Sequence, residues 1–397
     1  MLNIILFDDP IVKVDLLPFT YTRPVALIRC GILTLEEKWR YSLEGGYSYL
    51  SDAYLREKFP LTTADDNLYI NGSVIPDPDL AAAIRDLSVN EALYSPDEQL
   101  LALRSPQEWK PGQHPETFRH RIFDKDFGQV SKKWHINQLN GSQIAADLAL
   151  ISAVTSFKPV VDPFTSCYHP ERIFIEEGAV VRASILNAGD GPIYIGKNAL
   201  VQEGCMIQGP FALGEGAILS QGTKIRPNTS VGPYCKVGGE VSSSIFFGYS
   251  NKGHDGYLGN SVVGEWCNLG ANTNNSNLKN DYSSVKLFSY ATGEPEDTGL
   301  VNCGLYMGDY SKSGINTMFN TGTVAGVHVN VFGAGFQEKF IPSFSWGGKT
   351  EGYCTYRLDK ALSVAQMTAK SKKQVFTEAD ARLLGEVHKR SALYRAK

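Results

Sequence analysis

The feature of this 397-residue chain that most restricts its fold is a six-residue repeat in its second half. Aliphatic residues recur there at every sixth position without a slip, at Ile195, Val201, Ile207, Leu213, Leu219, Ile225, Val231 and Val237. Glycine directly follows several of them, and small residues stand four positions after most of them. Each hexad predicts a short strand and a turn, with the aliphatic side chain pointing to the axis of a stacked coil and glycine in backbone shapes that other residues avoid.

The repeat continues less regularly on both sides of this run. The earlier pair is Ile175 and Val181, and the later positions are Val263, Leu269, Met307, Ser313, Phe319, Ala325 and Val331. Ordinary strands with period-two alternation would also allow aliphatic residues six apart, but they would not require glycine directly after them. We therefore expect a β-solenoid, with Cys205 and Cys235 as small buried side chains in its turns.

The hexads lose their spacing between Glu240 and Gly259, where the chain reads EVSSSIFFGYSNKGHDGYLG. A break in a regular solenoid predicts a loop that projects from the wall, and such loops collect functional residues. His254 lies in this segment, with Lys252 and Asp255 close by. The asparagine run that follows, from Asn272 to Asn280, either serves the site or forms hydrogen bonds along the solenoid turns.

The segment KGHDGYLGNSVVGEWCNLGANTNNSN resembles the acetyltransferase domain of the bifunctional glucosamine-1-phosphate N-acetyltransferase and N-acetylglucosamine-1-phosphate uridyltransferase family. The family carries a Gly-His pair, then Tyr-Leu-Gly, then an Asn-Ile-Gly-Ala-Gly hexad and a Cys-Asn-Tyr. The resemblance covers roughly 110 residues. It implies a left-handed parallel β-helix, acetyl-CoA as co-substrate, and a homotrimer with active sites between neighbouring solenoids.

The resemblance also implies roles for individual residues. By position these are His254 as general base, Tyr257 and Asn268 as sugar contacts, Ala271 as an amide lining the acetyl-CoA channel, Asn277 as an orienting residue, and Arg226 as the phosphate ligand. The chemistry suits these residue types, because imidazole accepts a proton near neutral pH and guanidinium presents a forked pair of donors to phosphate. The alternatives are a solvated loop histidine and a surface ion pair.

The sequence departs from the family pattern at two positions, and these departures bear on the identity of the sugar more than on the acetyl transfer. Leu278 replaces the family's tyrosine, and Ser283 stands where a lysine is expected, although Lys279 and Lys286 are near. The identity of the amino sugar therefore stays open.

Residues 1–150 predict a small α/β domain. The expected elements are strands at Leu2–Phe7 and Asn67–Asn71, a capped helix from Thr34, a second from Asp77, a hairpin of Ala92–Ser95 with Gln99–Arg104, and a helix from Gln143 capped by Ser142. The N-terminal MLNIILFDDP lacks a basic region and indicates a first strand, not a signal peptide.

By its position before the solenoid, this domain resembles a reduced sugar nucleotidyltransferase domain of the same family. Thr22-Arg23 matches the end of the family's glycine-rich phosphate loop, Arg29 stands near the usual lysine, and Asn71 occupies the place of the metal-binding aspartate. The loop glycines are absent, and a neutral amide binds Mg²⁺ less well than a carboxylate. Three outcomes stay open: an altered nucleotidyltransferase using UTP or dTTP with Mg²⁺, a sugar-nucleotide-binding domain, or a scaffold.

The C-terminal region, residues 346–397, predicts two helices. One spans Leu358–Lys370, and Thr377 with Asp380 caps another that runs to about Tyr394. A solenoid needs its ends covered, so these helices are expected to close one end or cover a neighbour. Lys370, Lys372 and Lys373 either reach CoA phosphates or form a solvated face.

Composition removes several classes of function. The formal net charge is −4 without a basic block, and no apolar stretch is long enough to span a membrane, which argues against nucleic acid and membrane partners. The seven cysteines suit neither a disulfide framework nor zinc, which favours a cytoplasmic location.

We expect three parts, residues 1–150, 151–345 and 346–397, forming a transferase. The expected activity is acetyl-CoA-dependent N-acetylation of an amino-sugar phosphate, glucosamine 1-phosphate first, beside a domain that forms or binds a nucleotide sugar. One rival is a zinc lyase resembling the γ-class carbonic anhydrases, but His254, His328 and His169 are isolated in sequence. The other is a non-catalytic trimeric scaffold.

Overall fold

The computed structural model describes residues 2–111 and 118–395, which form two compact units. The first unit comprises the residues up to Leu16, Thr22–Ile28 and Leu33–His135, and the second comprises Leu17–Tyr21, Arg29–Ile32 and Ile136–Lys397. The expected division at residues 150 and 345 stays a prediction. Within the described residues, no helix is both long and apolar enough to cross a membrane.

The first unit is built on a mixed six-stranded sheet with the order β2-β1-β3-β6-β5-β7. Its strands are β1 (Leu2–Phe7), β2 (Gly45–Leu50), β3 (Asn67–Asn71), β5 (Glu91–Tyr94), β6 (Leu100–Ser105) and β7 (Arg119–Ile122). β1 pairs in parallel with both β2 and β3, whereas β5 and β6 form the expected antiparallel hairpin. A short antiparallel pair, β4 (Val74–Ile75) with β8 (Gly128–Gln129), stands apart from this sheet.

The α-helices described in this unit are α1 (Pro10–Asp15), α2 (Leu35–Ser42) and α3 (Pro78–Arg85). Two of them, α2 and α3, begin where the sequence predicts, whereas α1 was not predicted. Thr34 and Glu37 form a capping box on α2, and the Asp77 side chain accepts from Leu80 N at 2.9 Å at the start of α3. The caps satisfy amide groups that have no partner inside a helix, which fixes the starting residue.

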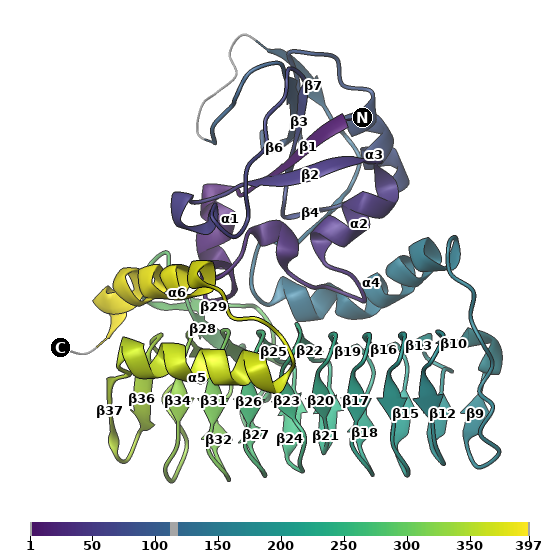
Figure 1. Cartoon of the computed structure of the whole chain (residues 1–397), viewed down its shortest axis with the longest axis vertical. Coiled ribbons are helices and arrows are strands. Elements are labelled where there is room, and N and C mark those ends of the chain that lie inside the picture. The colour runs from purple at the N-terminus through teal and green to yellow at the C-terminus, as the bar shows by residue number, and fades with distance from the viewer. Residues whose placement is uncertain (1, 112–117, 396–397) are drawn as a thin grey trace. The chain divides into compact units, whose positions relative to one another are not determined.

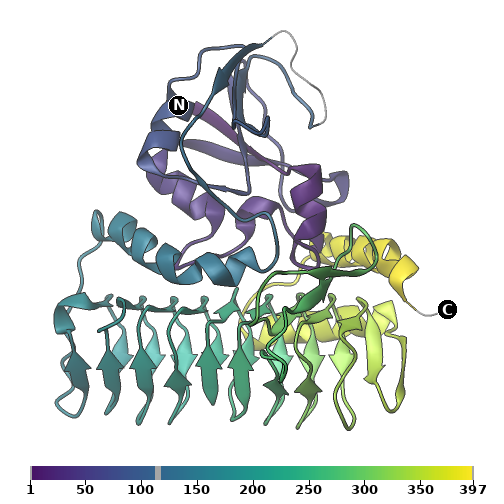
Figure 2. The same ribbon diagram turned by 180° about the vertical axis from the view of Figure 1, so that it is seen from behind.

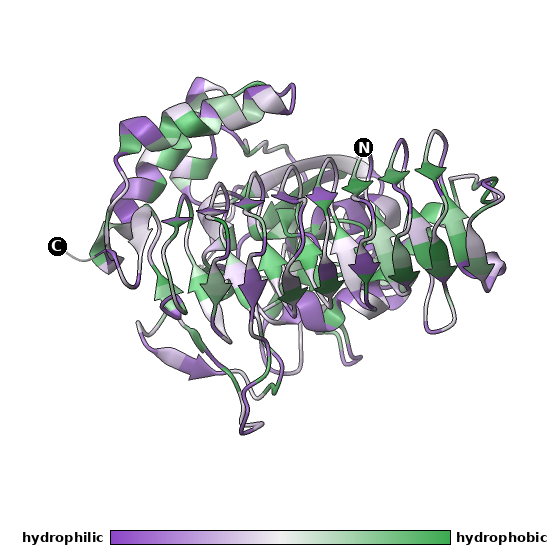
Figure 3. Cartoon of the chain, turned by 90° about the horizontal axis from the view of Figure 1, so that it is seen from below, coloured by the Kyte–Doolittle hydropathy of each residue, from purple (hydrophilic) through white to green (hydrophobic). Residues whose placement is uncertain are grey.

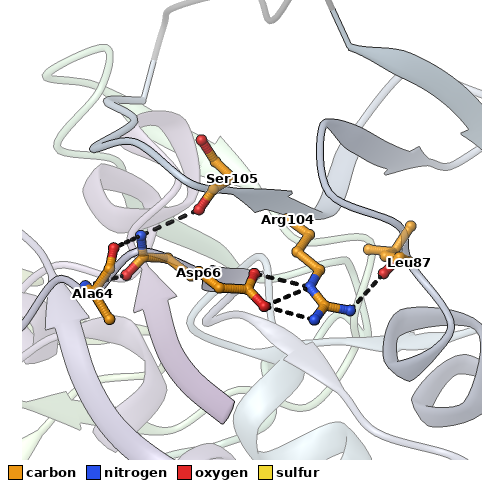
Figure 4. A network of polar contacts seen from close by, with 6 residues as sticks. Ala64, Asp66, Leu87, Arg104 and Ser105 are labelled. Atoms are coloured by element: carbon orange, nitrogen blue, oxygen red, sulfur yellow. Dashed lines mark hydrogen bonds and ion pairs between the residues drawn. The ribbon is translucent and has the colours of Figure 1, made fainter.

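An ion-paired network secures the end of β3 against β6 (Figure 4). The Arg104 guanidinium donates to Asp66 at 2.6 and 2.9 Å and to the Leu87 carbonyl at 2.9 Å. This pairing lowers the pKa of Asp66. Asn67 donates to the carbonyls of Ala64 and Ser105, so the strand end is held on both sides.

The second unit is a parallel β-helix whose coils stack three long sheets (Figure 1). The first sheet contains β10 (Ile173–Ile175), β13 (Ile193–Ile195), β16 (Phe211–Leu213), β19 (Thr229–Val231), β22 (Ile245–Phe246), β25 (Val262–Val263), β30 (Leu305–Met307), β33 (Thr323–Ala325) and β35 (Phe340–Ile341). The second contains β11 (Val180–Val181), β14 (Leu200–Val201), β17 (Ile218–Leu219), β20 (Lys236–Val237), β23 (Asn251–Lys252), β26 (Asn268–Leu269), β31 (Lys312–Ser313), β34 (Asn330–Val331), β36 (Ser345–Gly348) and the antiparallel β37 (Gly352–Thr355).

The third sheet contains β9 (Ser166–Tyr168), β12 (Ile185–Asn187), β15 (Met206–Gln208), β18 (Lys224–Ile225), β21 (Glu240–Ser242) and β24 (Tyr257–Gly259). A separate parallel pair, β27 (Asn274–Asn275) with β32 (Met318–Phe319), follows. Hydrophobic residues recur from coil to coil (Figure 3). The aliphatic residues of the unbroken hexads are all at most 3% exposed and belong to one core. The expected fold class, an α/β domain followed by a β-helix and C-terminal helices, is confirmed.

The glycines of the hexads have a different role from the one expected. Gly196, Gly214, Gly232 and Gly238 are absent from the residues with positive φ. A Cβ at Gly232 would lie 2.0 Å from the Phe247 carbonyl oxygen, and one at Gly238 would lie 2.7 Å from the Gly253 oxygen. These positions need glycine because the next coil passes against the backbone.

The loop expected at Glu240–Gly259 is wrong, because β21, β22, β23 and β24 continue the three sheets there. The register explains the lost spacing. Val231 pairs with Phe246 and Val237 with Lys252, so these coils are shorter than the regular ones, in which Leu219 pairs with Val237. Because the turns are shorter here, the inward positions no longer follow the six-residue period, although the chain stays in the coil.

The true excursion from the coil is the antiparallel hairpin of β28 (Lys286–Phe288) and β29 (Pro295–Asp297), which sequence reasoning missed (Figure 2). It returns through Tyr290, which is 6% exposed and packs edge-on against Tyr394. The C-terminal helices α5 (Leu358–Ser371) and α6 (Glu378–Arg390) are as predicted, including the Thr377–Asp380 capping box.

The helix expected from Gln143 instead begins seven residues before Ser142, as α4 (His135–Ser152). Ser142 lies inside the helix and donates to the Leu139 carbonyl, so its role as a cap is wrong. Gly141, inside this helix, allows close packing, because a Cβ there would lie 1.9 Å from Asn228 Oδ1. The neighbouring Asn140 donates to the Asn228 carbonyl at 2.9 Å.

Candidate functional site

His254 lies in the turn between β23 and β24, at a corner of the coil. The Asn272 amide donates to the Asp255 carbonyl at 2.9 Å from the following coil, and Ser220 Oγ donates to the Gly253 carbonyl at 3.1 Å from the side of the preceding coils. The backbone of the turn is therefore fixed from both sides. The imidazole itself is exposed, and no side-chain hydrogen bond holds it within the described part of the chain.

A groove of about 670 Å³ runs from His254 along the second sheet and is lined by Asn268 and Ala271 among others. The carbonyl of Ala271 accepts from Asn316 N at 2.8 Å, whereas its amide donates to no group among the residues described. Three residues that the resemblance grouped, His254, Asn268 and Ala271, thus share one cavity. A free amide and a basic side chain beside one groove are the parts that acyl transfer requires.

Ser371 and Lys372, at the end of α5, also line this groove. Lys372 Nζ donates to the Tyr234 carbonyl and to Asn251 Oδ1, both at 2.9 Å, and burial lowers the pKa of this lysine. Lys370 and Lys373 are exposed. Of the three lysines that could reach CoA phosphates, Lys372 therefore lines the groove, beside Lys236.

A second hollow, of about 490 Å³, is also lined by His254. Its other lining residues include Gln202, Gln221 and Asp255, and it shares His254 and Ala271 with the first. His254 thus lines two adjoining cavities.

The remaining expected sugar contacts meet on the third sheet and not in the groove. Asn277 Nδ2 donates to the Tyr257 hydroxyl at 3.2 Å and to Asn260 Oδ1 at 2.6 Å. Burial raises the pKa of Tyr257, so its hydroxyl stays a hydrogen-bond donor at neutral pH. Its register partner on β21 is Glu240, whose carboxylate accepts from Arg226 Nε at 3.1 Å.

A surface ion pair was the alternative expected for Arg226, and sequence reasoning missed only its partner, Glu240. The Arg226 side chain is 60% exposed, so its guanidinium is accessible even though one edge is paired. The structure therefore contains both the surface ion pair and an arginine that can meet an anion. Its assignment to a sugar phosphate stays a prediction.

Asn274 and Asn275 form hydrogen bonds along the solenoid turns, which was the second of the two expectations for the asparagine run. Asn274 Oδ1 accepts from Tyr257 N at 2.7 Å, and Asn275 bonds to both the amide and the carbonyl of Gly259. Asn275 occupies an inward position opposite Phe319 and is 5% exposed. These two amides join neighbouring coils, whereas Asn277 belongs to the polar group around Tyr257.

In the first unit, polar residues gather where parallel strands end. Asp8 follows β1, accepts from Val25 N at 2.8 Å, and pairs with Lys13 at 3.2 Å. Lys13 also pairs at 3.1 Å with Asp52, which comes after β2. Burial raises the pKa of Asp8 to about 6. The carboxyl ends of parallel strands are where open α/β sheets bind ligands, so this group is the unit's best candidate, and sequence reasoning missed it.

The residues expected to bind nucleotide are engaged within the fold. Asn71 is fully buried, and its Oδ1 accepts from Ser73 N and Oγ while its Nδ2 donates to Leu100 O. This amide does not fit a Mg²⁺ site. Arg23 is buried at 5% exposure in the first unit. Arg29 falls in the second unit, where it donates to the carbonyls of Phe247 and Ile32.

The described residues contain no disulfide and no cluster of side chains that could bind a metal ion. Seven cysteines are free, with Cys205 and Cys235 buried in the coil as expected. No group of three or more His, Cys, Asp or Glu side chains within residues 2–111 and 118–395 is placed to hold a metal ion.

Comparison with known proteins agrees with both halves of the sequence-based resemblance. Residues 4–155 match the sugar nucleotidyl transferase family. The bifunctional sugar-1-phosphate nucleotidylyltransferase/acetyltransferase of Sulfurisphaera tokodaii is 29% identical over 33% of this chain and 37% of its own length. The bifunctional protein GlmU of Methanocaldococcus jannaschii is 36% identical over 26% of this chain and 25% of its own.

An uncharacterized acetyltransferase of Escherichia coli, YaiX, is 25% identical over 42% of this chain and 73% of its own length. The chain spans well under half the length of the two bifunctional relatives. The suspected resemblance to the bifunctional family is confirmed, and the relatives are transferases by name, as expected.

Proposed function

We propose that this chain, which resembles the bifunctional nucleotidyltransferase and acetyltransferase family, is a transferase whose β-helix moves an acetyl group from acetyl-CoA to the nitrogen of an amino-sugar phosphate. The observation that carries this proposal is that His254 and Ala271 line two adjoining cavities together, the larger of which is also lined by Lys372. Glucosamine 1-phosphate is the first acceptor to test.

The residues supply the chemistry as follows. The amine must lose a proton before its lone pair attacks the thioester carbonyl, and the exposed His254 imidazole is the base that can take it. The attack forms the C–N bond, breaks the C–S bond and leaves CoA as the thiol. The Ala271 amide is a donor for the oxyanion that develops, and Lys372 and Lys236 offer positive charge to the CoA phosphates.

The acceptor would lie toward the polar group of Tyr257, Asn277 and Arg226. The half-buried Tyr257 and Asn277 suit sugar hydroxyl groups, and the exposed Arg226 guanidinium suits a phosphate. A homotrimer, in which a neighbouring coil completes the site, and a cytoplasmic location remain part of this proposal.

The first test is His254→Ala in the full-length protein, with acetyl transfer followed by release of free CoA thiol. We expect kcat to fall by about 10²–10⁴-fold with little change in KM, which is the usual effect of losing a general base. His169→Ala is the control, because that histidine is exposed elsewhere on the coil. An unchanged rate in His254→Ala would show that the catalytic assignment is wrong.

A second function is favoured by the match of residues 4–155 to the sugar nucleotidyl transferase family. We propose that the first unit binds UTP or dTTP at the carboxyl ends of β1 and β2, and that it joins the nucleotide to a sugar 1-phosphate with release of pyrophosphate. Mg²⁺ would be required only if this unit is active, and Asn71 would not be its ligand. Calorimetry with each nucleotide and a pyrophosphate assay separate turnover from binding alone. If neither nucleotide binds, a scaffold role for this unit is what remains.

A further inference from the structure

A lysine occupies an inward position of the β-helix in the coil that carries His254. Lys252 pairs in register with Val237, a hexad residue of the core, and Lys252 itself is only 1% exposed. Every residue of the unbroken hexads at this kind of position is aliphatic. A charged side chain placed there must be stabilised by specific partners, because desolvating an ammonium is costly.

Those partners are two backbone carbonyls. Lys252 Nζ donates to the Gly238 oxygen at 3.1 Å and to the His254 oxygen at 3.0 Å. The side chain therefore crosses from its strand to the turn that follows it, and it joins that turn to the coil below. Burial lowers the pKa of Lys252 to about 8, and the nearby Asp255 opposes this shift.

The glycines around the ammonium make room for this arrangement. A Cβ at Gly239 would lie 2.8 Å from Lys252 Nζ and 2.5 Å from the Gly256 oxygen. One at Gly238 would lie 2.7 Å from the Gly253 oxygen. The turn of residues 253–256 thus lies flat on the preceding coil, with the ammonium packed where a side chain would otherwise be.

An aliphatic residue would fill the inward position at lower cost, so packing alone does not account for a lysine. What the lysine adds is a pair of charge-assisted hydrogen bonds, one of them to the carbonyl of His254 itself. These bonds fix the backbone from which the exposed imidazole projects. No side-chain hydrogen bond in the described residues holds the imidazole itself.

We propose that Lys252 is a positioning residue, whose buried ammonium fixes the turn of residues 253–256 and so presents the His254 imidazole at the groove. Its effect on catalysis rests on the acetyl transfer proposed above. Its effect on the turn does not.

The test is Lys252→Met in the full-length protein, which keeps the length and bulk of the side chain and removes its donors. Lys252→Leu provides a second variant, since the coil uses leucine at inward positions such as Leu219 and Leu269. The matched control is Leu219→Met, a change in the same sheet two coils earlier that leaves the groove intact. Circular dichroism establishes that each variant keeps its coil.

The first measurement is amide hydrogen exchange of the unliganded protein. We expect the amides of Glu240 and Asn272, which donate to the Gly256 and Asp255 carbonyls of this turn, to exchange at least about tenfold faster in Lys252→Met than in the wild type, while amides of distant coils and those of Leu219→Met are unchanged. Unchanged exchange of these two amides overturns the proposal whatever the activity.

Steady-state kinetics gives the second reading. We expect kcat to fall by about 10–100-fold with KM for acetyl-CoA nearly constant, because a displaced base slows the chemical step without weakening the groove. Faster exchange with an unchanged kcat overturns the catalytic part. If the wild type acetylates none of the amino-sugar phosphates tried, the proposed function fails, and hydrogen exchange still decides the role of Lys252.

Discussion

A single histidine inside the β-helix gives the stability of this protein a definite pH dependence. His328 is 1% exposed, its ring lies between Tyr310 at 4.8 Å and Phe344 at 5.2 Å, and its Nε2 has no hydrogen-bond partner among the described residues. Burial, and secondarily the charge of Lys312, lowers the pKa of His328 to about 3. The imidazole is therefore neutral in the folded state, whereas an unfolded histidine takes up a proton near pH 6.5.

Because the folded pKa is depressed, this contribution to stability is complete above pH 6.5 and is lost as the pH falls toward 3. We expect His328→Phe, which keeps the ring stack, to reduce the loss of unfolding free energy between pH 7.5 and 4.5 by about 3 kcal/mol. Urea unfolding at both pH values measures this. His169→Gln, which changes an exposed histidine, is the control, and an identical pH dependence in His328→Phe contradicts the assignment.

Single residues also show where sequence reasoning reaches its limit. The regular hexads could be predicted because each inward position needs an aliphatic side chain. Lys252 and Asn275 could not be placed, since polar residues at inward positions look like residues of a loop. Their burial depends on carbonyl groups of neighbouring coils, which no local pattern encodes.

At the scale of the coil, the glycines that directly follow some of the aliphatic residues control how closely successive turns approach. Gly232 is the extreme case, because a Cβ at this position would lie 2.0 Å from the Phe247 oxygen and 2.5 Å from the Phe246 oxygen. Both obstacles are backbone atoms, so the coil itself must shift to admit a methyl group. We expect Gly232→Ala to lower the unfolding free energy by about 1–3 kcal/mol, as overpacking does.

The opposite result is expected for Gly385→Ala in α6, where a Cβ meets no atom within 4 Å. An unstrained alanine in a helix adds about 0.5–1 kcal/mol. Chemical denaturation of both variants tests the pair. Equal effects of the two substitutions would mean that close approach of the coils is not what requires Gly232.

Elements were predicted well where the signal was local and poorly where another element supplied it. Capping residues placed the starts of α2, α3 and α6. The start of α4 was missed because Ser142 resembles a helix cap in sequence, whereas the helix already begins at His135 and packs closely against Asn228 at Gly141. In the candidate site, the motif identified His254, but the loop expected around it is part of the coil. The contacts of Lys372 with Asn251 and of Glu240 with Arg226 are tertiary contacts, which no local pattern encodes.

At the scale of the whole molecule, the chain passes between its two units after residues 16, 21, 28, 32 and 135. Two short N-terminal segments are thereby built into the second unit. Phe19 is fully buried against Phe247 at 5.2 Å, and the amides of Gly31 and Ile32 donate to Asn140 and Asp147, each at 2.8 Å. A cut at residue 135 would remove these contacts from the β-helix.

We therefore expect the fragment 136–397 to unfold at a temperature at least several degrees below that of the β-helix in the full chain. A lost buried phenylalanine costs about 3–5 kcal/mol, and each broken hydrogen bond to a buried partner costs about 1–3 kcal/mol. Calorimetry of the fragment and of the full chain measures the difference. Full-length Phe19→Ala should shift the same transition in the same direction without any cut, and a fragment as stable as the intact chain would show that the β-helix does not depend on these segments.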